Sequence, residues 1–209
     1  MVDLSGSINE ETTPSDIIIA VMGPTGTGKS SFIKSVTGDE TIQIGSSLNS
    51  STQEFGVYSA VIDGRRVEFV DTPGFEDTRD ENSDADILQE LAAFLMQTYH
   101  DRKLFNAVIY MHRISDPRLG KITKRNLRLF TKICGGTSLQ NVVIVTTFWD
   151  SVNGVVGATR EDELRATFFK PLLDGGARIV RLDRGVLSAR KIISDITKNQ
   201  PRACNYSKN

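Results

Sequence analysis

The chain has 209 residues, with 25 Lys and Arg against 26 Asp and Glu, so its formal net charge is −1 at pH 7. Hydrophobic residues make up 39% and charged residues 24%, proportions that exclude a wholly disordered chain, a collagen and a long coiled coil. The length predicts one domain, and the lack of a basic excess argues against a nucleic-acid-binding protein.

Cysteine content and apolar runs indicate where the protein works. Two cysteines, Cys134 and Cys204, cannot build a disulfide framework and favour reduced thiols in a cytoplasmic protein. No apolar run in the sequence is long enough to cross a bilayer, so we expect membrane association only through segments outside this chain. Residues 1–15 are predicted to form a flexible leader and residues 198–209 a polar tail, which leaves 16–197 as one folded domain.

The hydrophobic pattern alternates between strands and helices, and it predicts an α/β fold: a three-layer α/β/α sandwich with about six mostly parallel strands, one of them an antiparallel hairpin strand. Asp63-Gly64 between two strand-like runs predicts the hairpin turn. Thr159 is the expected N-cap of the fourth helix, and Pro171 is expected to help end that helix. We predict strands at 16–22, 54–62, 65–70, 107–111, 141–147 and 178–182, and helices at 30–37, 84–99, 122–134, 159–169 and 187–197.

A glycine-rich loop directly follows the first predicted strand. Residues 23–30 read GPTGTGKS, which matches the phosphate-binding pattern G-x-x-x-x-G-K-[ST]. In such a loop the glycines let backbone N–H groups approach phosphate oxygens, and the next helix adds its positive N-terminus. Lys29 is suited to reach the β- and γ-phosphates, and the Ser30 hydroxyl to bind Mg²⁺. The residues expected to contact the nucleotide here are Gly23, Thr25, Gly26, Thr27, Gly28, Lys29, Ser30 and Ser31.

A second phosphate element follows the third predicted strand, where residues 71–74 read DTPG. An aspartate at a strand end beside the phosphate loop can hold Mg²⁺ directly or through water, which is the role predicted for Asp71. The Gly74 N–H is expected to approach the γ-phosphate. Loss of that phosphate would then release the following segment, as in nucleotide switches.

The residues after DTPG are typical of one group of GTPases. With Phe75 and Asp77-Thr78 in place, residues 16–197 resemble the septin-like (paraseptin) P-loop GTPases, and most of all the G domains of immunity-associated nucleotide-binding proteins and chloroplast-import receptors. The resemblance implies a Mg²⁺-dependent enzyme that binds GTP and hydrolyses it to GDP.

The resemblance also points to a switch threonine ahead of the hairpin. Thr52 matches the family's Ser-x-Thr element, so its hydroxyl is expected to complete the Mg²⁺ shell and its N–H to contact the γ-phosphate. Three other hydroxyl residues of this region stay open as alternatives for the same role. They are Thr41, Ser50 and Ser51.

The base site is expected after the fifth predicted strand, where the chain reads TFWD. Asp150 fits the role of accepting hydrogen bonds from guanine N1–H and the exocyclic amine, an edge that adenine lacks. GTPases usually carry a lysine where this chain has Phe148, so Phe148 or Trp149 is predicted to stack on the purine, with Thr147 joining the site. The missing lysine keeps an ATPase as an alternative. The resemblance places the second base loop near residues 183–184, without a clear motif.

The catalytic step needs a substitute for a missing glutamine, because Phe75 stands where Ras-like enzymes orient the attacking water. Arg113, just past the fourth predicted strand, is the candidate to supply positive charge. The resemblance implies a homodimer in which two G domains meet across their nucleotides and each Arg113 reaches the partner's site. The alternatives for Arg113 are a surface arginine beside Asp116 or a salt bridge in a dimer that forms without nucleotide, and His112 is a further candidate for positioning water. The predicted catalytic residues are Arg113, Thr52 and Lys29.

A second class of function fits the same residues. Because the glutamine is missing, a non-catalytic module that gates an interaction by binding GTP is the main alternative to an enzyme. Turnover that depends on dimer formation would separate the two.

Overall fold

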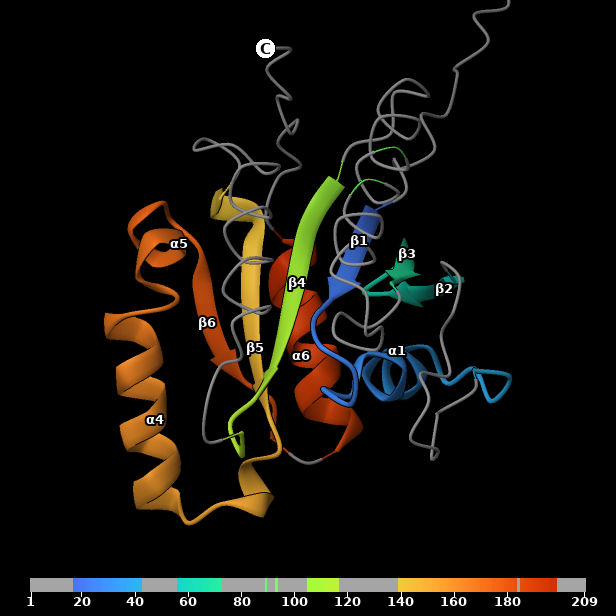
Figure 1. Ribbon diagram of the computed structural model, residues 1–209. Coiled ribbons are helices and arrows are strands. Elements are labelled where there is room, and N and C mark those ends of the chain that lie inside the picture. The colour runs from blue at the N-terminus through green and yellow to red at the C-terminus, as the bar shows by residue number, and fades with distance from the viewer. Residues whose placement is uncertain are drawn as a thin grey trace, which may run out of the picture.

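The computed structural model describes residues 17–42, 56–72, 105–116, 139–183 and 185–198, together with Gln89 and Ala93. In this part of the chain the sheet has six strands in the order β2-β3-β1-β4-β5-β6 (Figure 1). Neighbouring strands run parallel except β2 and β3, which are antiparallel. The strands are β1 (Ile17–Met22), β2 (Gly56–Ile62), β3 (Arg65–Asp71), β4 (Phe105–Arg113), β5 (Val142–Thr147) and β6 (Arg178–Arg181).

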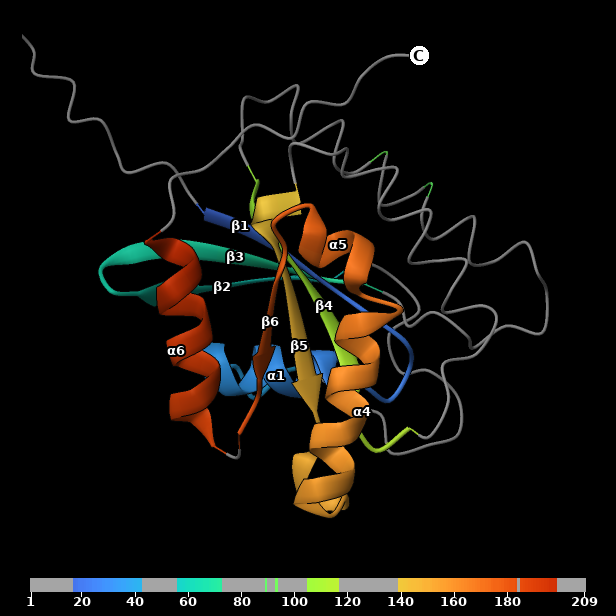
Figure 2. The same ribbon diagram turned by 90° about the vertical axis from the view of Figure 1, so that its left-hand side faces the viewer.

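Helices cover both faces of the sheet, with α1 and α6 on one side and α4 and α5 on the other (Figure 2). This arrangement confirms the predicted three-layer α/β/α fold. Among the described residues, no helix has the length and apolar character needed to cross a membrane. The helices are α1 (Lys29–Thr37), α4 (Gly154–Ala166), α5 (Lys170–Asp174) and α6 (Val186–Thr197), and the 3₁₀ turns η1 (Leu139–Asn141) and η2 (Trp149–Ser151) flank β5. The predicted helices at 84–99 and 122–134, the leader at 1–15 and the tail beyond 198 lie outside the described residues.

The buried strand β1 shows why the sequence forms this sandwich. All six of its residues are buried, because helices cover both faces of the sheet at its centre. Ile17, Ile19 and Val21 pack toward α1 and α6. The alternate side chains, Ile18 and Met22 among them, pack toward α4 and α5. The same alternation along β4 decides which of its side chains reach the loop that follows β1.

The start of α4 differs from the prediction, and Thr159 as its N-cap is wrong. The helix begins at Gly154, and the Asn153 side chain accepts a hydrogen bond of 2.9 Å from the Val155 N–H. Thr159 lies inside the helix, where its hydroxyl donates to the Val155 carbonyl at 3.0 Å. Asn is a strong N-cap residue, but the first turn presents exposed valines that break the amphipathic pattern.

The role predicted for Pro171 is also wrong. α4 ends at Ala166, and Pro171 lies in the first turn of the separate helix α5. A proline is tolerated there because the first N–H groups of a helix have no partner within it. The proline therefore helps to begin α5 and does not terminate α4.

His112 lies in the interior and not where it could position water for the phosphate loop. Its side chain is 3% exposed and meets the Phe169 ring edge-on, with ring centres 5.8 Å apart, on the sheet face covered by α5. Burial lowers the pKa of His112 from 6.5 to about 4. The imidazole is therefore a neutral core group at physiological pH.

This buried imidazole predicts acid sensitivity of the fold. Between pH 6.5 and about pH 4, His112 binds a proton in the unfolded chain but stays neutral in the folded protein. The free energy of unfolding therefore falls as the pH drops through this range. The shift corresponds to a loss on the order of 3 kcal/mol. Urea unfolding between pH 7 and 4 checks this, with His112→Leu expected to show a shallower decline. Parallel declines for the two proteins would contradict it.

Candidate nucleotide-binding site

The loop between β1 and α1 is shaped by its glycines. Gly23 has φ 141°, and a Cβ at this position would lie only 2.3 Å from the Met111 carbonyl oxygen of β4. Gly26 and Gly28 also have positive φ, and Gly28 is the N-cap of α1 in a left-handed conformation. The loop therefore runs directly over the backbone of β4, in the strand–loop–helix context that the phosphate-binding motif requires.

Lys29 is folded over this loop. Its ammonium donates hydrogen bonds to the carbonyl oxygens of Gly23 at 2.9 Å and Pro24 at 3.2 Å, and the side chain is 7% exposed. These bonds hold a positive charge at the opening of the loop, where the α1 N-terminus contributes its positive dipole end. The arrangement is built to receive anionic oxygens.

Thr27 and Thr147 tie the loop to the neighbouring strand β5. The Thr27 hydroxyl donates to the Pro24 carbonyl at 2.8 Å. The Thr147 hydroxyl is placed to donate to the Thr27 carbonyl at 3.1 Å and to the His112 carbonyl at 3.3 Å. Both threonines are buried. Sequence reasoning assigned them to the nucleotide site without this cross-link, which depends on how β4 and β5 lie beside the loop.

Ser30 and Asp71 meet at the mouth of the loop, as predicted for a Mg²⁺ site. The Ser30 hydroxyl donates to Asp71 Oδ2 at 2.6 Å. Asp71 Oδ1 is buried and has no hydrogen-bond partner among the described residues. A carboxylate and a hydroxyl oxygen suit Mg²⁺, which usually keeps few protein ligands and takes its other positions from phosphates and water. The residues present therefore fit the ion.

Burial has an electrostatic effect on this carboxylate. It raises the pKa of Asp71 above its ordinary value, against the opposing effects of the Ser30 hydrogen bond and the nearby Lys29 charge. A bound divalent cation would favour the ionised form. Thr52 and Gly74, predicted to serve the same phosphate site, lie outside the described residues.

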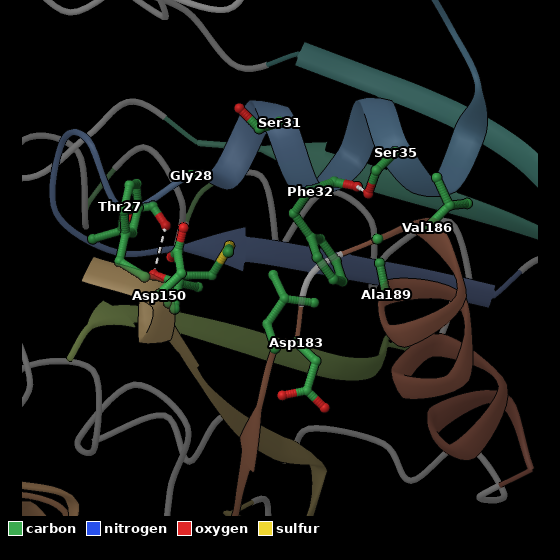
Figure 3. Close-up of a pocket in the computed structure, with 14 residues that line it drawn as sticks. Thr27, Gly28, Ser31, Phe32, Ser35, Asp150, Asp183, Val186 and Ala189 are labelled. Atoms are coloured by element: carbon green, nitrogen blue, oxygen red, sulfur yellow. Dashed lines mark hydrogen bonds between the residues drawn. The ribbon is translucent and has the colours of Figure 1, made fainter. Parts of the chain in front are cut away.

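A pocket of about 370 Å³ opens beside the loop (Figure 3). Figure 3 shows Ser31 and Ser35 of α1 along one side of it and Asp183 on the opposite side. Asp150 also lines the pocket, so the structure brings the two predicted base segments together. The lining residues are Thr27, Gly28, Ser31, Phe32, Ser35, Met111, Thr147, Phe148, Asp150, Leu182, Asp183, Gly185, Val186 and Ala189.

The two aromatic candidates for base stacking point to different places. Phe148 lines the pocket and is 38% exposed. Trp149 packs against Gly157 of α4, and its indole N–H lies 3.0 Å from the Thr146 hydroxyl and 3.2 Å from the Thr146 carbonyl. Of the two, Phe148 is therefore the aromatic side chain available to a base in this pocket.

Arg113 lies beside the phosphate loop of its own chain. Its Nε is 3.4 Å from Asp116 Oδ1, so the ion pair considered from the sequence is present. Its guanidinium carbon is 4.8 Å from the centre of the Phe148 ring. Nη1 is 3.4 Å from the position that a Cβ on Gly26 would occupy. The guanidinium is thus held between an acid, an aromatic ring and the loop.

Comparisons with known proteins identify a family for this chain. A family model described as 50S ribosome-binding GTPase matches residues 18–146. GTP-binding protein A of Dictyostelium discoideum is 30% identical over 134 residues, which make up 64% of this chain and 28% of that protein. The chain thus spans little more than a quarter of the length of this curated relative.

Solved structures of chloroplast-import components share the fold. Structures of Toc33 from Arabidopsis thaliana, one with Mg²⁺ and GMPPNP and one of a dimerization-deficient arginine-to-alanine mutant, have a TM-score of 0.71. Identities are 18% and 17%, and the alignments cover 92% of this chain and 88% of Toc33. A structure described as showing that dimerization is important for the GTPase activity of atToc33 and psToc159 matches with a TM-score of 0.70 at 17% identity, over 92% of this chain and 87% of that chain.

Replacing the Asp71 carboxylate tests its place at the metal site. Asp71→Asn keeps the Ser30 hydrogen bond and removes a charge that burial disfavours, so we expect the melting temperature of the nucleotide-free protein in EDTA to rise. The Mg²⁺-dependent gain in GDP affinity should fall at least tenfold, about 1.4 kcal/mol. Thermal melts and GDP titrations with and without Mg²⁺ measure both effects.

The exposed residue Asp162 of α4 supplies the control. Asp162→Asn also removes one negative charge, but from a residue outside the phosphate loop. It should leave the Mg²⁺-dependent gain in GDP affinity at the wild-type value. An Asp71→Asn protein with a full Mg²⁺ response would show that this carboxylate does not serve the ion.

Proposed function

Because this chain belongs to the GTPase family whose members are described as 50S ribosome-binding GTPases, we propose that it is a Mg²⁺-dependent GTPase that forms a homodimer across the nucleotide when GTP is bound. The observation that carries the proposal is the position of Arg113 at the edge of the phosphate loop, beside Gly26. A cation at that edge can serve its own nucleotide or that of a facing copy.

The phosphates are bound by the loop and by the residues at the start of α1. Backbone N–H groups between Gly23 and Gly28, together with Lys29, receive the phosphate oxygens. Ser30 and Asp71 would hold Mg²⁺, and Thr52 is proposed as a third ligand. Bound Mg²⁺ neutralises charge on the phosphates.

The base enters the pocket beside Phe148. There the Asp150 carboxylate accepts hydrogen bonds from N1–H and the exocyclic amine of guanine, and the Phe148 ring takes over the stacking role of the usual lysine stem. Adenine offers no paired donors to this carboxylate and leaves it without partners, which costs affinity. Membership of a GTPase family also weighs against the ATPase alternative.

Arg113 is proposed to supply the charge that the missing glutamine cannot. An arginine that reaches the transferring phosphoryl group in the transition state raises the rate by about 10³–10⁵. Support for a dimer comes from atToc33 and psToc159, for which dimerization is important for GTPase activity. The dimerization-deficient arginine-to-alanine mutant of Toc33 adds a second parallel.

One observation favours the non-catalytic alternative. Arg113 is already engaged by Asp116 and by the Phe148 ring, so turnover requires that it leave at least part of this arrangement. A domain in which Arg113 always keeps its contacts with Asp116 and the Phe148 ring would bind GTP without hydrolysing it. Such a domain would act as an interaction surface that is switched by GTP binding.

Turnover per molecule as a function of protein concentration separates the two functions. With Mg²⁺ and saturating GTP, the rate per molecule should rise with concentration and then reach a plateau. Arg113→Ala should lower that plateau at least 100-fold, about 2.7 kcal/mol. Sedimentation of the same samples with GDP and with GMPPNP reports whether a dimer accompanies the rise.

Arg178→Ala is a suitable control, because Arg178 is exposed at the opposite end of β6 from the pocket. It should follow the wild-type curve. A flat and very low rate in the wild type, unchanged by Arg113→Ala while GTP still binds, would contradict catalysis and support the gated module.

A further inference from the structure

We propose that Phe148 is a positioning residue that couples occupation of the base pocket to the placement of Arg113 at the phosphate loop. The inference rests on the proposed catalytic role of Arg113 and goes beyond it, because it names the side chain that sets the guanidinium position. It also assigns a function to the aromatic residue that stands where most GTPases carry lysine.

The strand register brings the two side chains together. Arg113 and Thr147 are paired residues at the ends of β4 and β5. The Ile114 N–H donates to the Thr147 carbonyl at 3.0 Å, which continues the ladder by one bond beyond the sheet. Phe148 directly follows the last residue of β5, so the arginine and the phenylalanine lie at adjacent and mutually bonded strand ends.

The ring lies against the arginine and beside the loop. The guanidinium carbon lies 4.8 Å from the Phe148 ring centre, within the range of a cation–π contact. Cε2 of the ring is 3.8 Å from the position of a Cβ on Gly28, and Arg113 Nη1 is 3.4 Å from the same position on Gly26. Ring and guanidinium therefore lie against two successive glycines of the phosphate loop.

The same ring lines the base pocket. One side chain thus lines the proposed base pocket, lies beside the phosphate loop and contacts the arginine proposed for catalysis. A purine stacked on Phe148 would restrict the ring, and a restricted ring would restrict the guanidinium that rests on it. Without the ring, Asp116 is the described residue that remains to hold Arg113 by an ion pair.

The backbone conformation of Phe148 indicates that the surrounding structure sets the direction of its ring. Phe148 has φ 58° and ψ 38°, a left-handed conformation that a bulky residue rarely adopts. It is fixed from both sides, because the Thr147 hydroxyl is bonded to the loop and the Trp149 indole to Thr146. Such conformations persist where the surroundings enforce them, and they cluster at functional sites.

A double-mutant cycle tests whether Phe148 acts through Arg113. The four proteins are the wild type, Phe148→Leu, Arg113→Ala and the double variant, each measured for kcat and KM with GTP and Mg²⁺ at the plateau concentration. We expect Phe148→Leu to lower kcat at least tenfold in the wild type and by less than twofold in Arg113→Ala. The rise in KM from lost stacking should be equal in both backgrounds. Phe148→Tyr, which retains an aromatic face, should recover most of the lost kcat.

A direct readout of the contact accompanies the kinetics. The chemical shift of a proton near an aromatic ring depends on its position relative to that ring, so the Arg113 Nε–H resonance, identified by its loss in Arg113→Ala, should shift in Phe148→Leu and shift again when GDP binds the wild type. A resonance insensitive to Phe148→Leu would overturn the proposal.

The kinetic outcomes separate failure of this inference from failure of the proposed function. Equal losses of kcat in both backgrounds, with Arg113→Ala still slow, would mean that Phe148 serves the nucleotide alone, which overturns the inference and leaves the GTPase proposal standing. No effect of Arg113→Ala on kcat would overturn both. Melting curves of all variants confirm that they are folded, which the partial exposure of Phe148 favours.

Discussion

The close contact between the phosphate loop and β4 constrains the rest of the site. At Gly23 there is no room for a side chain, since a Cβ would meet the Met111 carbonyl oxygen at 2.3 Å. The loop therefore follows the β4 backbone, and the Thr147 hydroxyl then joins it to the end of β5. Three strand ends form one connected unit as a result. Any shift between β4 and β5 would move the loop, Arg113 and the base pocket together.

Two adjacent aromatic residues divide their contacts between the nucleotide side and the core side of this unit. Phe148 faces the pocket in a left-handed backbone conformation that costs about 1–2 kcal/mol. Contacts of Trp149 on the core side help to offset this cost. The Arg181 guanidinium carbon lies 4.1 Å from the centre of the Trp149 ring, and Arg181 Nε donates to the buried Glu161 carboxylate at 3.0 Å. The segment that carries both aromatic residues is thereby fastened to α4 and β6, while Phe148 lines the pocket.

The sequence predicted most of what depends on local pattern and less of what depends on register. The three layers, the six mostly parallel strands and the meeting of Ser30 with Asp71 follow from buried β-branched runs and a phosphate motif, whereas the strand order is seen only in the structure. The start of α4 was misplaced because exposed valines obscured the helical pattern and Asn153 was overlooked as a cap. The contact of Arg113 with Phe148 could not be foreseen, since it requires the pairing of Arg113 with Thr147, two residues that lie far apart in the sequence on different strands.

We propose that the pocket beside Phe148 binds guanine through Asp150, and exchange of the base tests this recognition directly. Xanthine carries a carbonyl where guanine has its exocyclic amine, so an amide side chain suits xanthine and a carboxylate suits guanine. Titration of wild type and Asp150→Asn with GDP and xanthosine diphosphate, both with Mg²⁺, measures the preference. We expect the wild type to favour GDP by at least about 100-fold and Asp150→Asn to reverse the order. An Asp150→Asn protein with unchanged preference would contradict it.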